Sequence, residues 1–160
     1  MNTLRVDEGF VPFPVADGDE SFANGVFEFN ITRIRAHVER DPADVALVQV
    51  EVSSFPRWDR PLDDAHVASA DLSRPVVLAE ISPGRFNLID GHHRLEKARR
   101  NGVGTLQAYQ LTAVQHVRFL TSRRAYLAYV EYWNGKVEER SQAASDGPSA
   151  RTTRSFPTPT

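Results

Sequence analysis

The chain has 160 residues, a formal net charge of −2 and no cysteine, which allows one domain with a hydrophobic core and excludes disulfides, thiolate metal sites and thiol nucleophiles. Hydrophobic residues make up 41% of the sequence and charged residues 25%, so any nucleic-acid-binding surface must be a local basic patch. No apolar run approaches the roughly 20 residues that cross a bilayer, and residues 1–8 lack a signal-peptide pattern. We therefore expect a cytoplasmic protein without membrane contact.

Residues 1–25 contain two prolines and three glycines among acidic residues, a composition typical of an irregular arm. A short strand is expected at 27–29. Asn30 then precedes apolar residues at helical spacing, so it is predicted to cap a helix that ends at Asp41 and Pro42. The domain proper is therefore expected to begin directly after the arm.

The middle of the chain alternates between strand and helix signals. Alternating valines predict a half-buried strand over 45–52, and prolines with Trp58 mark a loop over 53–64. This order of elements indicates a small mixed sheet with helices packed on it. The expected elements that follow are a short helix over 62–72, strands over 76–81 and 86–89 joined by a turn, a helix over 91–100 and a strand over 105–111.

The pattern after residue 113 is helical, with two helices separated near Thr121 and the second ending at Asn134 and Gly135. Residues 141–160 are rich in Ser, Thr, Pro and Ala, which predicts a disordered tail. The predicted class is α+β, a small mixed β-sheet with packed helices and a helical C-terminal extension. The predicted organisation is an irregular N-terminal arm (1–25), a central domain (26–112), the helical extension (113–140) and the tail (141–160).

Five consecutive residues, Asp90, Gly91, His92, His93 and Arg94, carry the strongest chemical signal. They lie where a strand gives way to a helix, so Asp90 is expected to cap that helix. The amino end of a helix is already electropositive and its first N–H groups lack partners, yet cationic and imidazole side chains crowd it here. A bound phosphate would relieve the repulsion, and Gly91 would let it approach the backbone. The alternative is a plain cap and turn with neutral histidines.

The same segment resembles the ParB/sulfiredoxin superfamily. The resemblance is strongest over residues 75–106 and includes the run GRFNLIDGHHRL at 84–95. It implies a ParB/sulfiredoxin-like fold that binds nucleotide phosphates, with Gly91, His93 and Arg94 as phosphate contacts. A nucleoside triphosphate with Mg²⁺ is one candidate ligand, and Mg²⁺ held by one carboxylate is the arrangement expected if phosphate is transferred or hydrolysed. His92 stands where sulfiredoxins have a cysteine, so the sulfinic-acid repair reaction is excluded.

The resemblance leaves three functions open. Chromosome-partition members of the superfamily carry a second phosphate motif of the type Glu-Asn-x-x-Arg, which does not occur after Leu111, and further DNA-reading and dimer domains. The hypotheses are a nucleotide-binding domain that hydrolyses or transfers phosphate, a non-catalytic DNA-associated regulatory protein, and a ParB-like nuclease. No catalytic residue is assigned, although several carboxylates lie in or near loops: Asp59, Asp63, Asp64, Glu80 and Asp90.

The sequence also bears on two further classes of partner and on a metal site. DNA is an alternative partner through a set of cations, Arg94, Lys97, Arg99, Arg100, Arg118, Arg123 and Arg124. The last three are otherwise a solvated face or a substitute for the second phosphate motif. A homodimer through the C-terminal helices is suggested by the aromatic residues Tyr126, Tyr129, Tyr132 and Trp133, which otherwise pack in the core. No metal site is expected, because adjacent residues on a helix, such as His92 and His93, point about 100° apart.

Overall fold

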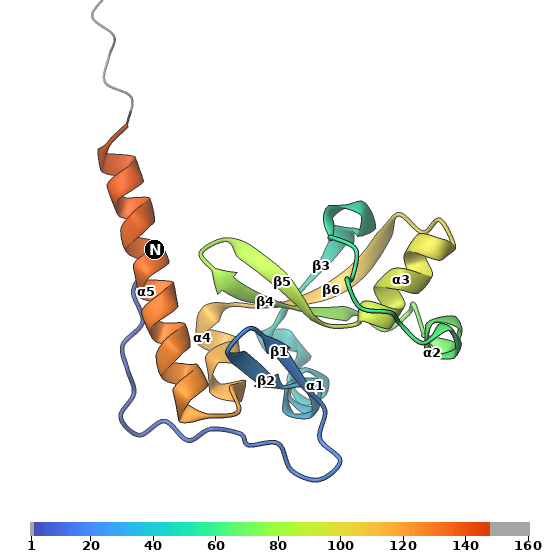
Figure 1. Ribbon diagram of the computed structural model, residues 1–160, viewed down its shortest axis with the longest axis horizontal. Helices are drawn as coiled ribbons and strands as arrows, with labels where there is room; N and C mark the ends of the chain where they lie inside the picture. The colour runs from blue at the N-terminus through green and yellow to red at the C-terminus, as the bar shows by residue number, and fades with distance from the viewer. Residues whose placement is uncertain (1, 148–160) are drawn as a thin grey trace, which may run out of the picture.

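The computed structural model describes residues 2–147 and has an α+β fold built on a four-stranded mixed sheet. The strand order is β3-β6-β4-β5, in which β4 pairs parallel to β6 and the two outer pairs are antiparallel. A separate hairpin, β1-β2, lies beside the sheet (Figure 1). The strands are β1 (Ser21–Asn24), β2 (Phe27–Asn30), β3 (Ala46–Glu51), β4 (Val76–Ser82), β5 (Arg85–Asp90) and β6 (Thr105–Leu111).

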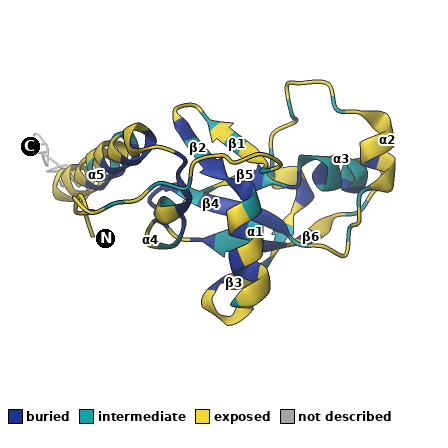
Figure 2. Cartoon of the chain, turned by 90° about the horizontal axis from the view of Figure 1, so that it is seen from below, coloured by how far each residue is buried: buried dark blue, intermediate teal, exposed yellow. Residues whose placement is uncertain are grey.

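Five α-helices lie in the described part of the chain and surround the sheet. In both orientations of the molecule, α2 and α3 lie at one end and α5 at the other (Figures 1 and 2). The helices are α1 (Ile31–Arg40), α2 (Asp64–Ser69), α3 (His92–Arg100), α4 (Ala113–His116) and α5 (Arg123–Ser145), with 3₁₀ turns at Pro42–Asp44, Val52–Ser54 and Val117–Phe119. None of the helices within residues 2–147 is long and apolar enough to cross a membrane.

The two faces of the sheet belong to two separate hydrophobic clusters. In β4, Val77 and Ala79 point into a large cluster with α1, α4 and α5, whereas Val76 and Leu78 point into a smaller cluster with α3. This split follows from the strand period of two, which sends successive side chains to opposite faces. β4 is buried on both faces, as Figure 2 shows.

Most of the predicted elements of the central domain are confirmed within a few residues. Asn30 caps α1, since its side chain accepts a hydrogen bond from the N–H of Arg33 at 3.1 Å. The strand predicted over 105–111 is β6 without a shift of either end. The helix predicted over 62–72 is shorter, because Asp63 caps it by accepting from the N–H groups of Ala65 and His66.

The C-terminal helix differs from the prediction. Asn134 and Gly135 do not end it, and α5 continues to Ser145, so residues 141–145 are helical rather than part of a tail. Asn134 instead binds the arm, donating to the carbonyl of Leu4 and accepting from its N–H. Trp133 also donates to the arm, at the carbonyl of Asn2. The last 13 residues of the predicted tail, 148–160, lie outside the described residues.

The arm lies against α5 and then leads into the β1-β2 hairpin (Figure 1). Residues 2–20 contain neither helix nor strand, as predicted, but Ser21–Asn24 form β1, paired with β2. The ring of Phe10 stacks on Tyr126 at a centroid distance of 3.9 Å. The arm therefore covers the aromatic face of α5.

Candidate functional site

The amino end of α3 follows β5 through Gly91, which adopts a left-handed conformation with φ of 114°. A Cβ added at this glycine would lie 2.5 Å from Cγ1 of Val76, so glycine is required both for conformation and for space. The first turn closes through the N–H of Leu95, which donates to the Gly91 carbonyl at 2.9 Å. This glycine was part of the predicted phosphate site, and the structure places it in the turn between β5 and α3.

The helix has no side-chain cap at this end. Within residues 2–147, the N–H groups of His92, His93 and Arg94 have no hydrogen-bond acceptor. A helix start of this kind carries about half a positive charge, which aligned peptide dipoles produce. The amino end of α3 therefore offers three backbone donors.

Asp90 does not cap α3, contrary to the prediction. It is the last residue of β5, and its carboxylate binds Arg35 of α1 through two hydrogen bonds, at 2.9 Å from Nε and 2.7 Å from Nη2. Burial disfavours its ionised form, but the hydrogen bonds and charge of Arg35, followed by the charge of Arg94, hold the pKa of Asp90 below its ordinary value. Asp90 is thus an ionised structural carboxylate.

Arg94 also differs from its predicted role as a phosphate contact. One guanidinium nitrogen donates to Asp90 at 3.2 Å, and another donates to the carbonyls of Arg74 and Pro75. Its side chain is only 11% exposed. A buried guanidinium needs such partners because an unpaired buried charge is strongly unfavourable. Arg94 therefore fastens the segment before β4 to α3.

The later cations of α3 are engaged in the same way. Lys97 donates to the carbonyls of Ala68 and Ala70, at the carboxyl end of α2. Arg99 donates to the carbonyls of Phe55 and Pro56, and Arg100 pairs with Asp64 and Glu96. These cations hold the 55–75 segment around α3, and their interactions account for much of the predicted basic patch.

An open cavity of about 540 Å³ lies in front of the amino end of α3. Its lining includes Arg74, His66 and His93. The imidazole rings of the two histidines meet edge to face, with 5.5 Å between their centroids. Within residues 2–147, the guanidinium of Arg74 has no ion pair or hydrogen-bond partner. The cavity therefore combines free backbone donors with an unpaired cation.

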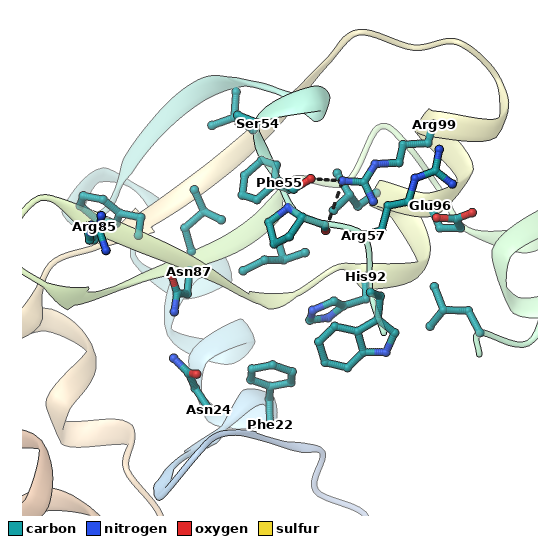
Figure 3. Close-up of a pocket in the computed structure, with 18 of the residues that line it drawn as sticks. Phe22, Asn24, Ser54, Phe55, Arg57, Arg85, Asn87, His92, Glu96 and Arg99 are labelled. Atoms are coloured by element: carbon teal, nitrogen blue, oxygen red, sulfur yellow. Dashed lines mark hydrogen bonds between the residues drawn. The ribbon is translucent and has the colours of Figure 1, made fainter. Parts of the chain in front are cut away.

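His92 faces a different environment from His93. Its ring stacks on Phe22 of β1 at 5.1 Å and lies 3.9 Å from Trp58, both between ring centroids. Burial lowers the pKa of His92 to about 4, so the ring is neutral at pH 7. This aromatic cluster, Phe22, Trp58 and His92, lines the first cavity and also a second one of about 620 Å³. Figure 3 shows the second cavity, with Phe22 and His92 at its edge.

The remaining cations and aromatic residues of the prediction lie elsewhere. Arg118 donates to His37, and Arg123 pairs with Glu8 of the arm. Three of the four C-terminal aromatic residues are buried within the chain, and one, Tyr132, is 39% exposed. The buried three are Tyr126, Tyr129 and Trp133, with exposed fractions of 3%, 0% and 5%.

Several residues of the site were missed by sequence reasoning. Arg35 and Glu20, which form an ion pair at 2.6 Å, come from α1 and the arm, far from residue 90 in sequence. Phe22 and Trp58 reach the site from β1 and a loop. The one local signal was a tryptophan inside the Pro-rich loop 53–64, where a large apolar ring needs a surface to cover.

Comparison of the chain with protein-family models, with curated proteins and with solved structures gives no match. The resemblance to the ParB/sulfiredoxin superfamily therefore rests on the residues of 75–106. Within residues 2–147, no group of three or more His, Asp or Glu side chains is placed to hold a metal ion.

Proposed function

We propose that the chain is a nucleotide-binding domain of ParB/sulfiredoxin type that holds phosphate at the amino end of α3. The observation that carries the proposal is the uncapped helix start, opened by Gly91, in front of a cavity of about 540 Å³. Phosphate oxygens accept hydrogen bonds from such N–H groups, and the helix dipole favours the negative charge. The short segment around residue 91 that resembles the superfamily coincides with this geometry.

The side-chain charges around the cavity cancel, so its attraction for an anion comes mainly from the backbone. Three arginines and three carboxylates line it and offset one another, namely Arg35, Arg74, Arg94, Glu20, Asp71 and Asp90. What remains is the helix dipole, the free backbone donors and three imidazoles, those of His66, His92 and His93. Arg74 is the arginine that can turn to a phosphate without breaking an existing ion pair.

The state of the carboxylates favours binding without turnover, the non-catalytic alternative. Asp90 and Glu20 both pair with Arg35, and Asp71 accepts from Ser73. A carboxylate held by a guanidinium is a poor general base and a poor ligand for Mg²⁺. Association with DNA and nuclease activity remain hypotheses that the same variants test.

The proposal is tested by thermal unfolding with ATP, ADP, CTP or GTP and Mg²⁺. We expect at least one nucleotide to raise the melting temperature, because a ligand that binds the folded state stabilises it. Arg74→Ala is expected to lower the affinity for that nucleotide by about tenfold, because one charge-assisted hydrogen bond is lost. Arg124→Ala on α5, an exposed arginine remote from the cavity, is the matched control and is expected to change nothing.

The variant Arg94→Ala is the less informative one, since it also releases the carbonyls of Arg74 and Pro75. No shift with any of the four nucleotides would contradict the proposal. Steady release of phosphate would contradict the non-catalytic hypothesis and show that the chain is an enzyme. Magnesium-dependent nicking of plasmid DNA, lost in Arg74→Ala, would favour the nuclease.

A further inference from the structure

The second cavity, of about 620 Å³, lies between β5, β1 and the loop after β3 (Figure 3). Its floor is apolar and comes from the sheet and from α3, through Leu78, Leu88 and Leu95. Aromatic rings close its sides, and two amide side chains stand at its rim. A cavity of this size and composition is typical of a site for a small molecule.

His92 connects this cavity to the phosphate site. It is the first residue of α3, so its backbone N–H is one of the free donors at the amino end. Its ring contacts those of Phe22 and Trp58 and lines both cavities. A ligand with its phosphate on the helix start therefore passes this ring before it reaches the second cavity.

We infer that the second cavity holds the base of the nucleotide whose phosphates bind at the amino end of α3, an inference that rests on the proposed function. The occupant is a planar heteroaromatic ring, because the walls offer the rings of Phe22, Trp58 and His92 for stacking. Stacking of bases on aromatic side chains is favourable for every base. The aromatic cluster would therefore contribute affinity, and base selectivity must come from polar groups.

Two amides supply those polar groups. Asn24 ends β1 and Asn87 lies in the middle of β5, and their side chains point toward each other across the mouth of the cavity (Figure 3). Within residues 2–147, neither side-chain amide has a hydrogen-bond partner. Each amide offers two donors and an acceptor, the pattern that the edge of a base requires.

The test compares inorganic tripolyphosphate with ATP, CTP and GTP by isothermal titration calorimetry, using the chain and its Trp58→Ala variant. We expect the preferred nucleotide to bind about tenfold or more tightly than tripolyphosphate, and Trp58→Ala to remove most of that difference. Each nucleotide affinity is compared with that for tripolyphosphate in the same variant, because Trp58 also lines the phosphate cavity. Tyr132→Ala, an aromatic truncation on the exposed side of α5, is the matched control.

Asn87→Ala provides a second variant that leaves the core untouched, since Asn87 is exposed. It is expected to reduce the preference among the three nucleotides without changing the affinity for tripolyphosphate. If tripolyphosphate and nucleotides bind equally and Trp58→Ala has no effect, the inference is overturned and the phosphate site stands. If none of these ligands binds, the proposed function is overturned together with the inference.

Discussion

The two faces of the four-stranded sheet are packed in contrasting ways. Among the described residues, the face under α1, α4 and α5 belongs to a cluster of twenty buried hydrophobic residues, whereas the face under α3 belongs to a cluster of eight. The α3 face is completed by polar clamps and leaves the cavity of about 620 Å³. The contrast connects stability with the first face, the closed face, and the proposed ligand binding with the second, the open face.

The clamps explain how the open face stays ordered with few apolar contacts. Lys97 and Arg99 bind backbone carbonyls of the 55–70 segment, and Arg94 binds those before β4. Hydrogen bonds from charged donors are about twice as strong as neutral ones. The cations of α3, which the sequence suggested as a ligand-binding surface, therefore mainly hold the neighbouring loop segments against this helix.

The largest difference between the faces is expected from truncation of a phenylalanine on each. Phe29→Ala on the closed face removes a fully buried ring and is expected to lower the free energy of unfolding by about 3–5 kcal/mol. Phe86→Ala beside the open cavity removes a partly buried ring, so its loss is expected to be smaller. Urea denaturation measures both, and equal losses would contradict the contrast.

A pH series sharpens the comparison through His116 on the closed face. Burial lowers the pKa of His116 to about 4, against 6.5 for the unfolded chain. Between these values the unfolded chain binds a proton that the folded chain does not, so stability falls as the pH is lowered. The expected slope is about 1.4 kcal/mol per pH unit, or about 3 kcal/mol in all.

The variant His116→Gln is expected to lose this dependence, measured as the free energy of unfolding between pH 7 and 4. His92→Gln on the open face is the comparison. Burial also lowers the pKa of His92, but its ring lines two open cavities, so its effect on the slope is expected to be smaller. An unchanged slope in His116→Gln would show that other groups set the acid sensitivity.

The smallest of the three effects concerns the turn before α3. Gly91 and Gly102 both have positive φ, but only at Gly91 would a Cβ collide, with Val76. Gly102→Ala is expected to cost about 1 kcal/mol of unfolding free energy, and Gly91→Ala about 2–3 kcal/mol. Thermal unfolding compares the two, and an equal cost would mean that Val76 yields without strain.

The sequence predicted the central elements because their signals are local. Asn30 before an apolar helical pattern, the alternation in β3 and the turn residues between β4 and β5 each act within a few positions. The predicted end of α5 was wrong because packing with distant parts of the chain decides it. Glycine weakens a helix by about 1 kcal/mol, and the packing of Trp133 and Val137 across Gly135 outweighs that loss.

For the candidate site, the sequence by itself determined the strand, the glycine and the helix that create an electropositive backbone end, because all three depend on adjacent residues. Only the tertiary structure decided which cations stay available there. Arg35 arrives from α1 to neutralise Asp90, and Arg94 pairs across its own first turn. The tertiary structure also places Trp58 against His92. The sequence could not show these ion pairs and ring contacts, because they depend on distance in space and a motif records only distance along the chain.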